Sequence, residues 1–256
     1  MKKILLVATS LVALSTVAGA GTESHNYMGG GLGWVMANAK ASNFATLELG
    51  GGGAPGSSGN VAKRGEDNAP IGKIFLGRSF NEGSINLLTE VSLALDTSNA
   101  KGTTSTRVIH DAGNAVSEAF KSSLKRKGIL GLSFGLSGNV VRDVLLYGKA
   151  SLLVARFKAS SSASATAVGG VAAAAATQLN ALSPFFTNKT AYGFGLTVGA
   201  SKPVTEKISL GVDYTFEMYQ KIKIKGGAII NGYPYAYTGT IKPQYHTIMV
   251  SMSTKI

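Results

Sequence analysis

Apolar and polar residues alternate along much of this chain, most clearly over residues 207–224. Even positions there are apolar at Ile208, Leu210 and Val212, whereas the odd positions between them are polar or small. Successive side chains of a β-strand point to opposite faces, so the pattern predicts a strand with one apolar and one polar face. Its length exceeds the usual five or six residues of a soluble sheet and suits a tilted strand that crosses a bilayer.

The alternation recurs, and glycine and serine are frequent on the less apolar face. We count eight predicted strands, near residues 26–39, 71–80, 84–95, 128–138, 143–158, 189–201, 207–224 and 240–256. Small and polar residues cannot form the dry core of a sandwich, but they can line a hydrated barrel whose other face meets lipid. Lipid satisfies no backbone groups, so such a sheet must close on itself. A soluble β-sandwich is the alternative.

The predicted connections alternate between short and long. Short ones fall near 81–83, 138–142 and 202–206, and long ones near 40–70, 96–127, 159–188 and 225–239. This layout is typical of outer-membrane barrels, in which an even strand number places both termini in the periplasm. Apolar residues at helical spacing predict a short amphipathic helix over 106–127, packed on the barrel or free to dock elsewhere. The Ala- and Ser-rich run 159–181 is predicted to be a second helix or a mobile segment.

The first twenty residues have the features of an export signal. Lys2 and Lys3 precede an apolar run from Ile4 to about Val17, and Ala18-Gly19-Ala20 follows. A basic start, a short apolar middle and a small-x-small end predict a cleaved signal peptide over 1–20 and a barrel domain over 21–256. The alternative, an anchoring helix, would need about 20 apolar residues. Cysteine is absent, which excludes disulfides and thiolate chemistry.

By pattern and layout, the chain resembles the eight-stranded outer-membrane barrels of the OmpA transmembrane domain, OmpX and opacity-protein type. The resemblance implies a transmembrane antiparallel β-barrel, here with long external loops that contain short helices, in the bacterial outer membrane as a monomer. The last strand departs from these families, because it ends at Ile256 where they usually place an aromatic residue.

Charged residues also fall on the face predicted to point into the barrel. They carry both signs and come from four strands: Lys73, Glu90, Lys149, Asp213 and Glu217. Unpaired buried charges are costly, so we expect these groups to pair across the lumen. The resemblance implies a comparable network that plugs the interior. The alternative is a gate or a narrow ion path.

The remaining charge is basic and points to anionic partners. The formal net charge is +12, and +10 without Lys2 and Lys3. We expect contact with outer-membrane lipid, lipopolysaccharide phosphates and host protein or glycan, and no nucleic acid, since the chain is exported. The predicted loop residues for such contact, of which the tyrosines could equally form an aromatic girdle, are Lys121, Lys125, Arg126, Lys127, Tyr233, Tyr235 and Tyr237.

No catalytic, metal or cofactor site is predicted. His25, His110 and His246 are scattered, and Asp213 and Glu217 lie about 13 Å apart along one strand face. The sequence therefore predicts a non-enzymatic surface barrel for adhesion or envelope contact. The alternatives are a small porin or solute channel and a purely structural envelope protein.

Overall fold

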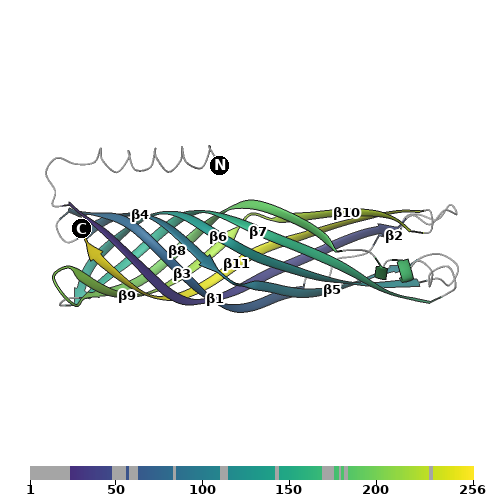
Figure 1. The fold of residues 1–256 in the computed structure, drawn as a ribbon, viewed down its shortest axis with the longest axis horizontal. Helices are drawn as coiled ribbons and strands as arrows, with labels where there is room; N and C mark the ends of the chain where they lie inside the picture. The colour runs from purple at the N-terminus through teal and green to yellow at the C-terminus, as the bar shows by residue number, and fades with distance from the viewer. Residues whose placement is uncertain are drawn as a thin grey trace.

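A computed structural model describes residues 24–47, 56–57, 63–82, 85–109, 115–141, 144–168, 176–178, 180–181, 184–230 and 233–256, so the predicted signal peptide lies outside the described residues. The strands wind around a long, narrow barrel (Figure 1). They are β1 (Ser24–Leu47), β2 (Gly56–Ser57), β3 (Lys63–Glu82), β4 (Ile85–Asp96), β5 (Asn99–Ile109), β6 (Ala115–Val141), β7 (Val144–Val168), β8 (Phe185–Pro203), β9 (Ile208–Tyr219), β10 (Ile222–Ile230) and β11 (Tyr233–Lys255).

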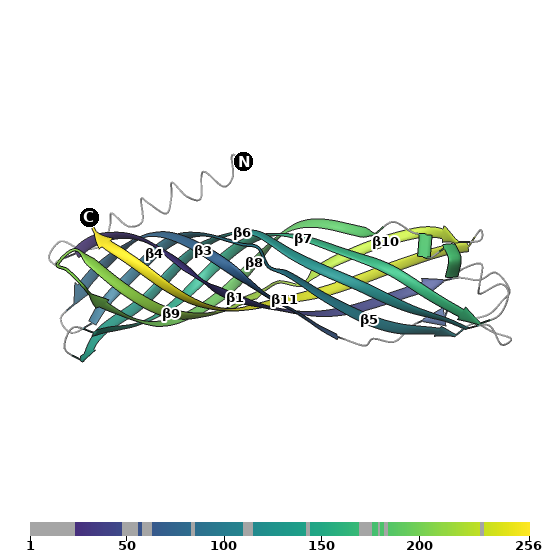
Figure 2. The same cartoon turned by 60° about the horizontal axis from the view of Figure 1, so that its bottom comes forward.

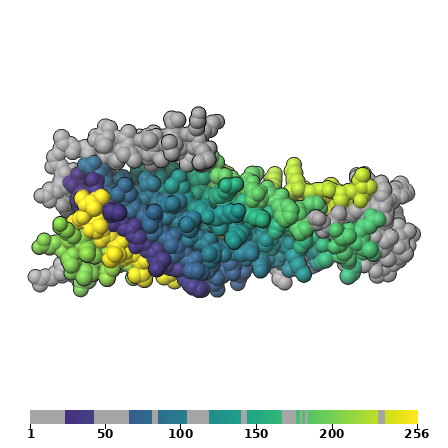
Figure 3. All heavy atoms as spheres, in the orientation of Figure 1, coloured from purple at the N-terminus to yellow at the C-terminus, as the bar shows by residue number. Residues whose placement is uncertain are grey.

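These strands occupy eight positions in the wall. β4 and β5 both pair with β6, and β9 and β10 both pair with β11, so each of these couples fills one position; β2 is a short addition to β1. The wall closes where β1 pairs antiparallel with β11, from Tyr27 opposite Lys255 to Leu47 opposite Tyr235. Figure 3 shows these two strands, purple and yellow, side by side. The prediction of an eight-stranded antiparallel barrel is confirmed.

An apolar belt surrounds one half of the barrel. This half contains Ser24, Lys255 and the short connections between strands, and we call its outer end the turn end. Exposed apolar side chains alternate along β4 from Ile85 to Leu95 and along β9 from Ile208 to Met218. Ten residue steps of about 3.3 Å in a strand tilted by about 40° rise about 25 Å, the height of the apolar band of an outer-membrane barrel.

Beyond the belt the faces exchange polarity, at a level that we call the rim. Along β1 the inward residues change from Gly29, Gly31 and Gly33 to a buried Val35 and three buried alanines, while the exposed residues change from Leu32 and Trp34 to Lys40. The segment past the rim, which we call the extension, therefore has a dry interior and a polar outer wall. It forms the right half of Figure 2 and rises about 30 Å along β7.

At two positions in the wall, the exchange of polarity between the inner and outer faces requires an irregularity in the strand. In β6 the pairing with β7 shifts between Arg126 and Gly128, so even-numbered residues face lipid below the shift and the interior above it. Between β9 and β10, Met218 pairs with Gln244 but Ile222 with Ile241, so one extra residue lies on the β9–β10 side. A one-residue insertion turns the following side chains to the other face.

The helix predicted over 106–127 is wrong: the described residues of this range, 106–109 and 115–127, belong to the paired strands β5 and β6. The described residues of the predicted long connections are likewise mostly strand, because β1, β3, β7, β10 and β11 all continue past the rim. Helical structure among the described residues is limited to 176–178 and 180–181, where the Asn180 side chain forms hydrogen bonds with the backbone of Ala165 in β7. No described helix has the length and hydropathy to span a membrane.

Candidate functional site

Three of the five predicted lumenal charges meet inside the belt. Glu90 on β4 is buried, and its two carboxylate oxygens accept hydrogen bonds from Lys73 Nζ and Lys149 Nζ, each at 2.8 Å. Both ammonium groups also lie over the ring of Phe75, 5.4 and 6.0 Å from its centroid. One carboxylate thus holds two cations from β3 and β7, and the cluster links three wall positions across the lumen.

Asp213 lies near this cluster and accepts a hydrogen bond from Tyr147 Oη at 3.2 Å. These groups form the upper end of a cavity of about 690 Å³ whose lining extends to the turn end at Ser201, Ser253 and Lys255. Glycine on the inward face makes room here: a side chain at Gly77 or Gly199 would collide with the ring of Tyr27 or Tyr147. The lower half of the lumen is therefore roomy and polar.

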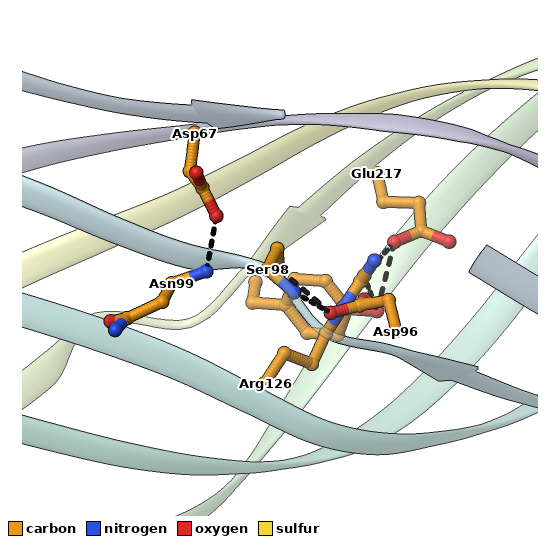
Figure 4. Close-up of polar contacts among 7 residues, drawn as sticks. Asp67, Asp96, Ser98, Asn99, Arg126 and Glu217 are labelled. Carbon is orange, nitrogen blue, oxygen red and sulfur yellow. Dashed lines mark hydrogen bonds and ion pairs between the residues drawn. The ribbon is translucent and has the colours of Figure 1, made fainter. Parts of the chain in front are cut away.

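Glu217, the fifth predicted charge, belongs to a second cluster at the rim (Figure 4). Its carboxylate pairs with Arg126 Nη1, while Arg126 Nε donates to Asp96 Oδ2 at 2.5 Å. Asp96 Oδ1 accepts hydrogen bonds from Ser98 N and Oγ at 3.0 and 2.7 Å. The guanidinium group also lies 3.7 Å from the ring centroid of Tyr245. Arg126 is fully buried, so this rim cluster crosses the lumen as a layer of paired charges and rings.

Above the rim cluster the interior is apolar and aromatic. The ring of Tyr237 lies between those of Phe120 and Phe185, at centroid distances of 4.8 and 5.3 Å. Its hydroxyl donates to Ser161 Oγ at 2.7 Å, and burial raises the pKa of that hydroxyl. Ile222, Ile224 and other fully buried side chains complete this core. The described part of the lumen is thus filled from the rim upward.

Three of the predicted loop residues lie elsewhere than expected. Arg126 is a lumenal residue, because the irregularity in β6 reverses which face of the strand points inward, so that the even positions above it are lumenal. Tyr235 and Tyr237 are buried in the extension, so the prediction that they are exposed contact residues is wrong. The side chain of Tyr233 lies outside the described part of the chain. Of the charges in the rim cluster, the sequence signalled Glu217 but not Asp96 or Arg126, since both of these fell in a predicted loop.

Lys121, Lys125 and Lys127 do lie on the exposed outer wall, on β6. Lys125 stands directly opposite Lys158 of β7, and Arg156 pairs with Gly128 one step nearer the belt. We call these five exposed cations the β6–β7 patch: Lys121, Lys125, Lys127, Arg156 and Lys158. Like charges directly across a sheet repel each other, so this patch favours an anionic counterpart.

The described histidines do not converge. His25 lies at the turn end of β1, whereas Nδ1 of His246 is 2.6 Å from Tyr214 Oη on the outer wall at the rim. His110 lies outside the described residues. Among the residues that the structure describes, no three His, Asp or Glu side chains are grouped as metal ligands.

The closed ring and its apolar belt define the chain as an outer-membrane β-barrel. No protein-family model and no curated protein sequence matches it. Solved structures with a similar fold include Neisserial surface protein A (14% identity over 88% of this chain and 97% of that one, TM-score 0.36). The Escherichia coli outer membrane protease OmpT is also similar, with 9% identity over 91% of this chain and 97% of that one and a TM-score of 0.40. Pseudomonas aeruginosa OprG has 11% identity over 92% of this chain and 98% of that one, with a TM-score of 0.36.

Proposed function

We propose that the chain is a non-enzymatic surface protein whose barrel anchors it in the outer membrane and whose extension attaches to an anionic partner. The pairing of Lys125 with Lys158 carries this proposal, since it places two exposed lysines opposite each other within the β6–β7 patch. The partner would be a sulfated glycan of a host surface. The turn end would face the periplasm, as expected for an even number of strands.

Binding of a sulfated polysaccharide such as heparin by the refolded chain tests this function. We expect the triple variant Lys121→Gln, Lys125→Gln, Lys158→Gln to lose at least tenfold in affinity, because each lysine near an anionic partner contributes about fivefold. The wild-type affinity should fall as salt rises. A matched control removes three exposed turn-end lysines, Lys202, Lys207 and Lys255. An equal loss in both triple variants would contradict a specific patch.

The proposal also requires a closed lumen. The rim cluster around Arg126 and the aromatic stack at Tyr237 support closure, because their buried side chains occupy the described lumen above the polar cavity. Single-channel recording of the chain in planar bilayers should show no steady conductance, with a band shift between unboiled and boiled samples as the folding control.

A small channel is the second candidate function, and the cavity of about 690 Å³ favours it. Reproducible openings whose conductance changes on Lys149→Gln or Glu90→Gln would make the protein a pore and overturn the closed-barrel proposal. The same recordings on Lys121→Gln serve as the control, since that lysine lies on the outer wall.

A further inference from the structure

The ribbon of β1 and β11 shows a stepwise gradient of polarity on its outer wall. Opposed outward pairs run from Leu32 and Val250, through Trp34 and Ile248, to Met36 and His246. The next outward pairs are Asn38 with Gln244 and then Lys40 with Lys242. Apolar residues, an aromatic girdle, amides and cations in this order match the layers of a bilayer leaflet from acyl chains to headgroups.

The cations at the end of this gradient continue onto a third strand position. Ile241 of β11 pairs with Ile222, the first residue of β10. Lys221 immediately precedes this pair on one side and Lys242 follows it on the other, and Lys223 comes next on β10. All four side chains are exposed, and we call them the lysine row: Lys40, Lys242, Lys221 and Lys223.

This row has little protein countercharge. β1, β10 and β11 contain no acidic residue. The adjacent β3 contributes Glu66, which is opposite Asn38 and diagonal to Lys40. One carboxylate beside four lysines leaves an excess of positive charge. Lys40 and Lys242 also face each other directly, which destabilises the ribbon unless an anion lies between them.

We propose that the lysine row binds the phosphate groups of an outer-leaflet phosphorylated glycolipid, lipopolysaccharide, whose acyl chains lie against the apolar belt below it. Lys40 is four residues past Met36, a rise of about 10 Å at the tilt used above, and the headgroup layer is about 5–8 Å thick on each side. Lysine side chains bend toward headgroups while their methylenes cover apolar surface. The row thus reaches phosphates at the rim and uses none of the β6–β7 patch.

The test is titration of the refolded full chain with purified lipopolysaccharide, with the same lipid after enzymatic removal of its phosphates, and with phosphatidylglycerol. We expect the triple variant Lys40→Gln, Lys221→Gln, Lys242→Gln to raise the apparent Kd for intact lipopolysaccharide at least tenfold, at about fivefold for each lysine. Its Kd for the dephosphorylated lipid should not change. Wild type should bind intact lipopolysaccharide more tightly than phosphatidylglycerol.

The matched control is the patch variant Lys121→Gln, Lys125→Gln, Lys158→Gln, which loses the same charge and should keep the wild-type Kd for lipopolysaccharide. An equal loss in both triple variants, or equal binding of phosphatidylglycerol, would reduce the effect to general attraction and overturn the site. Unchanged affinity in the row variant would also overturn it. Heparin binding by the same two variants reports separately on the proposed attachment function.

Discussion

Arg126 lies inside the lumen at the rim, where its side chain is fully buried. Its guanidinium group joins Asp96 of β4 to Glu217 of β9 and lies against the rings of Tyr219 and Tyr245. A buried ion pair of this kind adds little net stability relative to apolar residues, but removal of one partner leaves buried charge without compensation. The three charged groups of the rim cluster therefore stabilise the fold only as a complete set.

We expect Arg126→Leu to lower the free energy of unfolding by about 3–5 kcal/mol, because two buried carboxylates lose their cation. Urea unfolding in lipid vesicles, followed by the fluorescence of Trp34 on the lipid face, measures the change. Lys127→Leu is the control, since Lys127 is exposed one residue away. Equal effects of the two substitutions would show that the rim cluster has no special role.

Glu90 was found from the sequence, whereas Asp96 and Arg126 were not. Glu90 stands on the polar face of a regularly alternating strand, so its lumenal side followed from its position. Arg126 is flanked by Lys125 and Lys127, and nothing in that run of three cations marks the middle one as buried. Alternation puts Arg126 on the opposite face from both lysines, and the shift of pairing in β6 makes that face the inner one. The shift becomes visible only when β7 is in place.

At the scale of elements, β6 passes through two environments, the lipid-facing belt and the extension. Below its irregularity Leu132, Phe134 and Leu136 face lipid, and above it Phe120 and Leu124 are buried in the extension. The residues of 106–127 have apolar positions at helical spacing, but β6 pairs with β5 on one side and with β7 on the other. Two complete ladders satisfy more backbone groups than an isolated short helix, which is marginal in water.

Adjacent substitutions in β6 test this assignment. Leu124→Glu should place a charge in the dry core and open the extension, since burial of an unpaired charge is costly. We expect proteinase K to cut the extension at least tenfold faster in vesicle-inserted protein, with the belt still protected. Lys125→Glu puts the same residue on the outer wall and should remain resistant. Similar cleavage of both variants would favour an irregular loop over a strand in this region.

At the scale of the whole molecule, the barrel combines a membrane half with a water-facing half of opposite polarity. The belt presents apolar residues outward and encloses a polar cavity, while the extension presents lysines outward and encloses aromatic rings. Each half obeys the same rule, that apolar surface avoids water. The rim is the level at which the outer solvent changes from lipid to water.

This architecture depends on export, which the first twenty residues predict. We expect the mature chain to begin at Gly21, because small residues at Ala18 and Ala20 suit signal peptidase. Ala20→Arg should leave a longer precursor, detected by intact-mass measurement of membrane fractions, whereas Thr22→Arg should be processed normally. A wild-type chain that retains Met1 in the membrane would contradict the predicted cleavage.

The pattern of residues was enough to predict long alternating strands, their closure into an eight-stranded barrel, and the inward positions of Lys73, Glu90 and Lys149. Period-two alternation shows that the two faces of a strand differ, and within the belt this was sufficient to assign the inward-pointing side chains. The three-dimensional fold was needed to locate the reversal of polarity, the burial of Arg126, Tyr235 and Tyr237, and the strands formed by most described residues of the predicted loops. The reason is physical: alternation does not reveal which environment each face meets, and one inserted residue exchanges the faces.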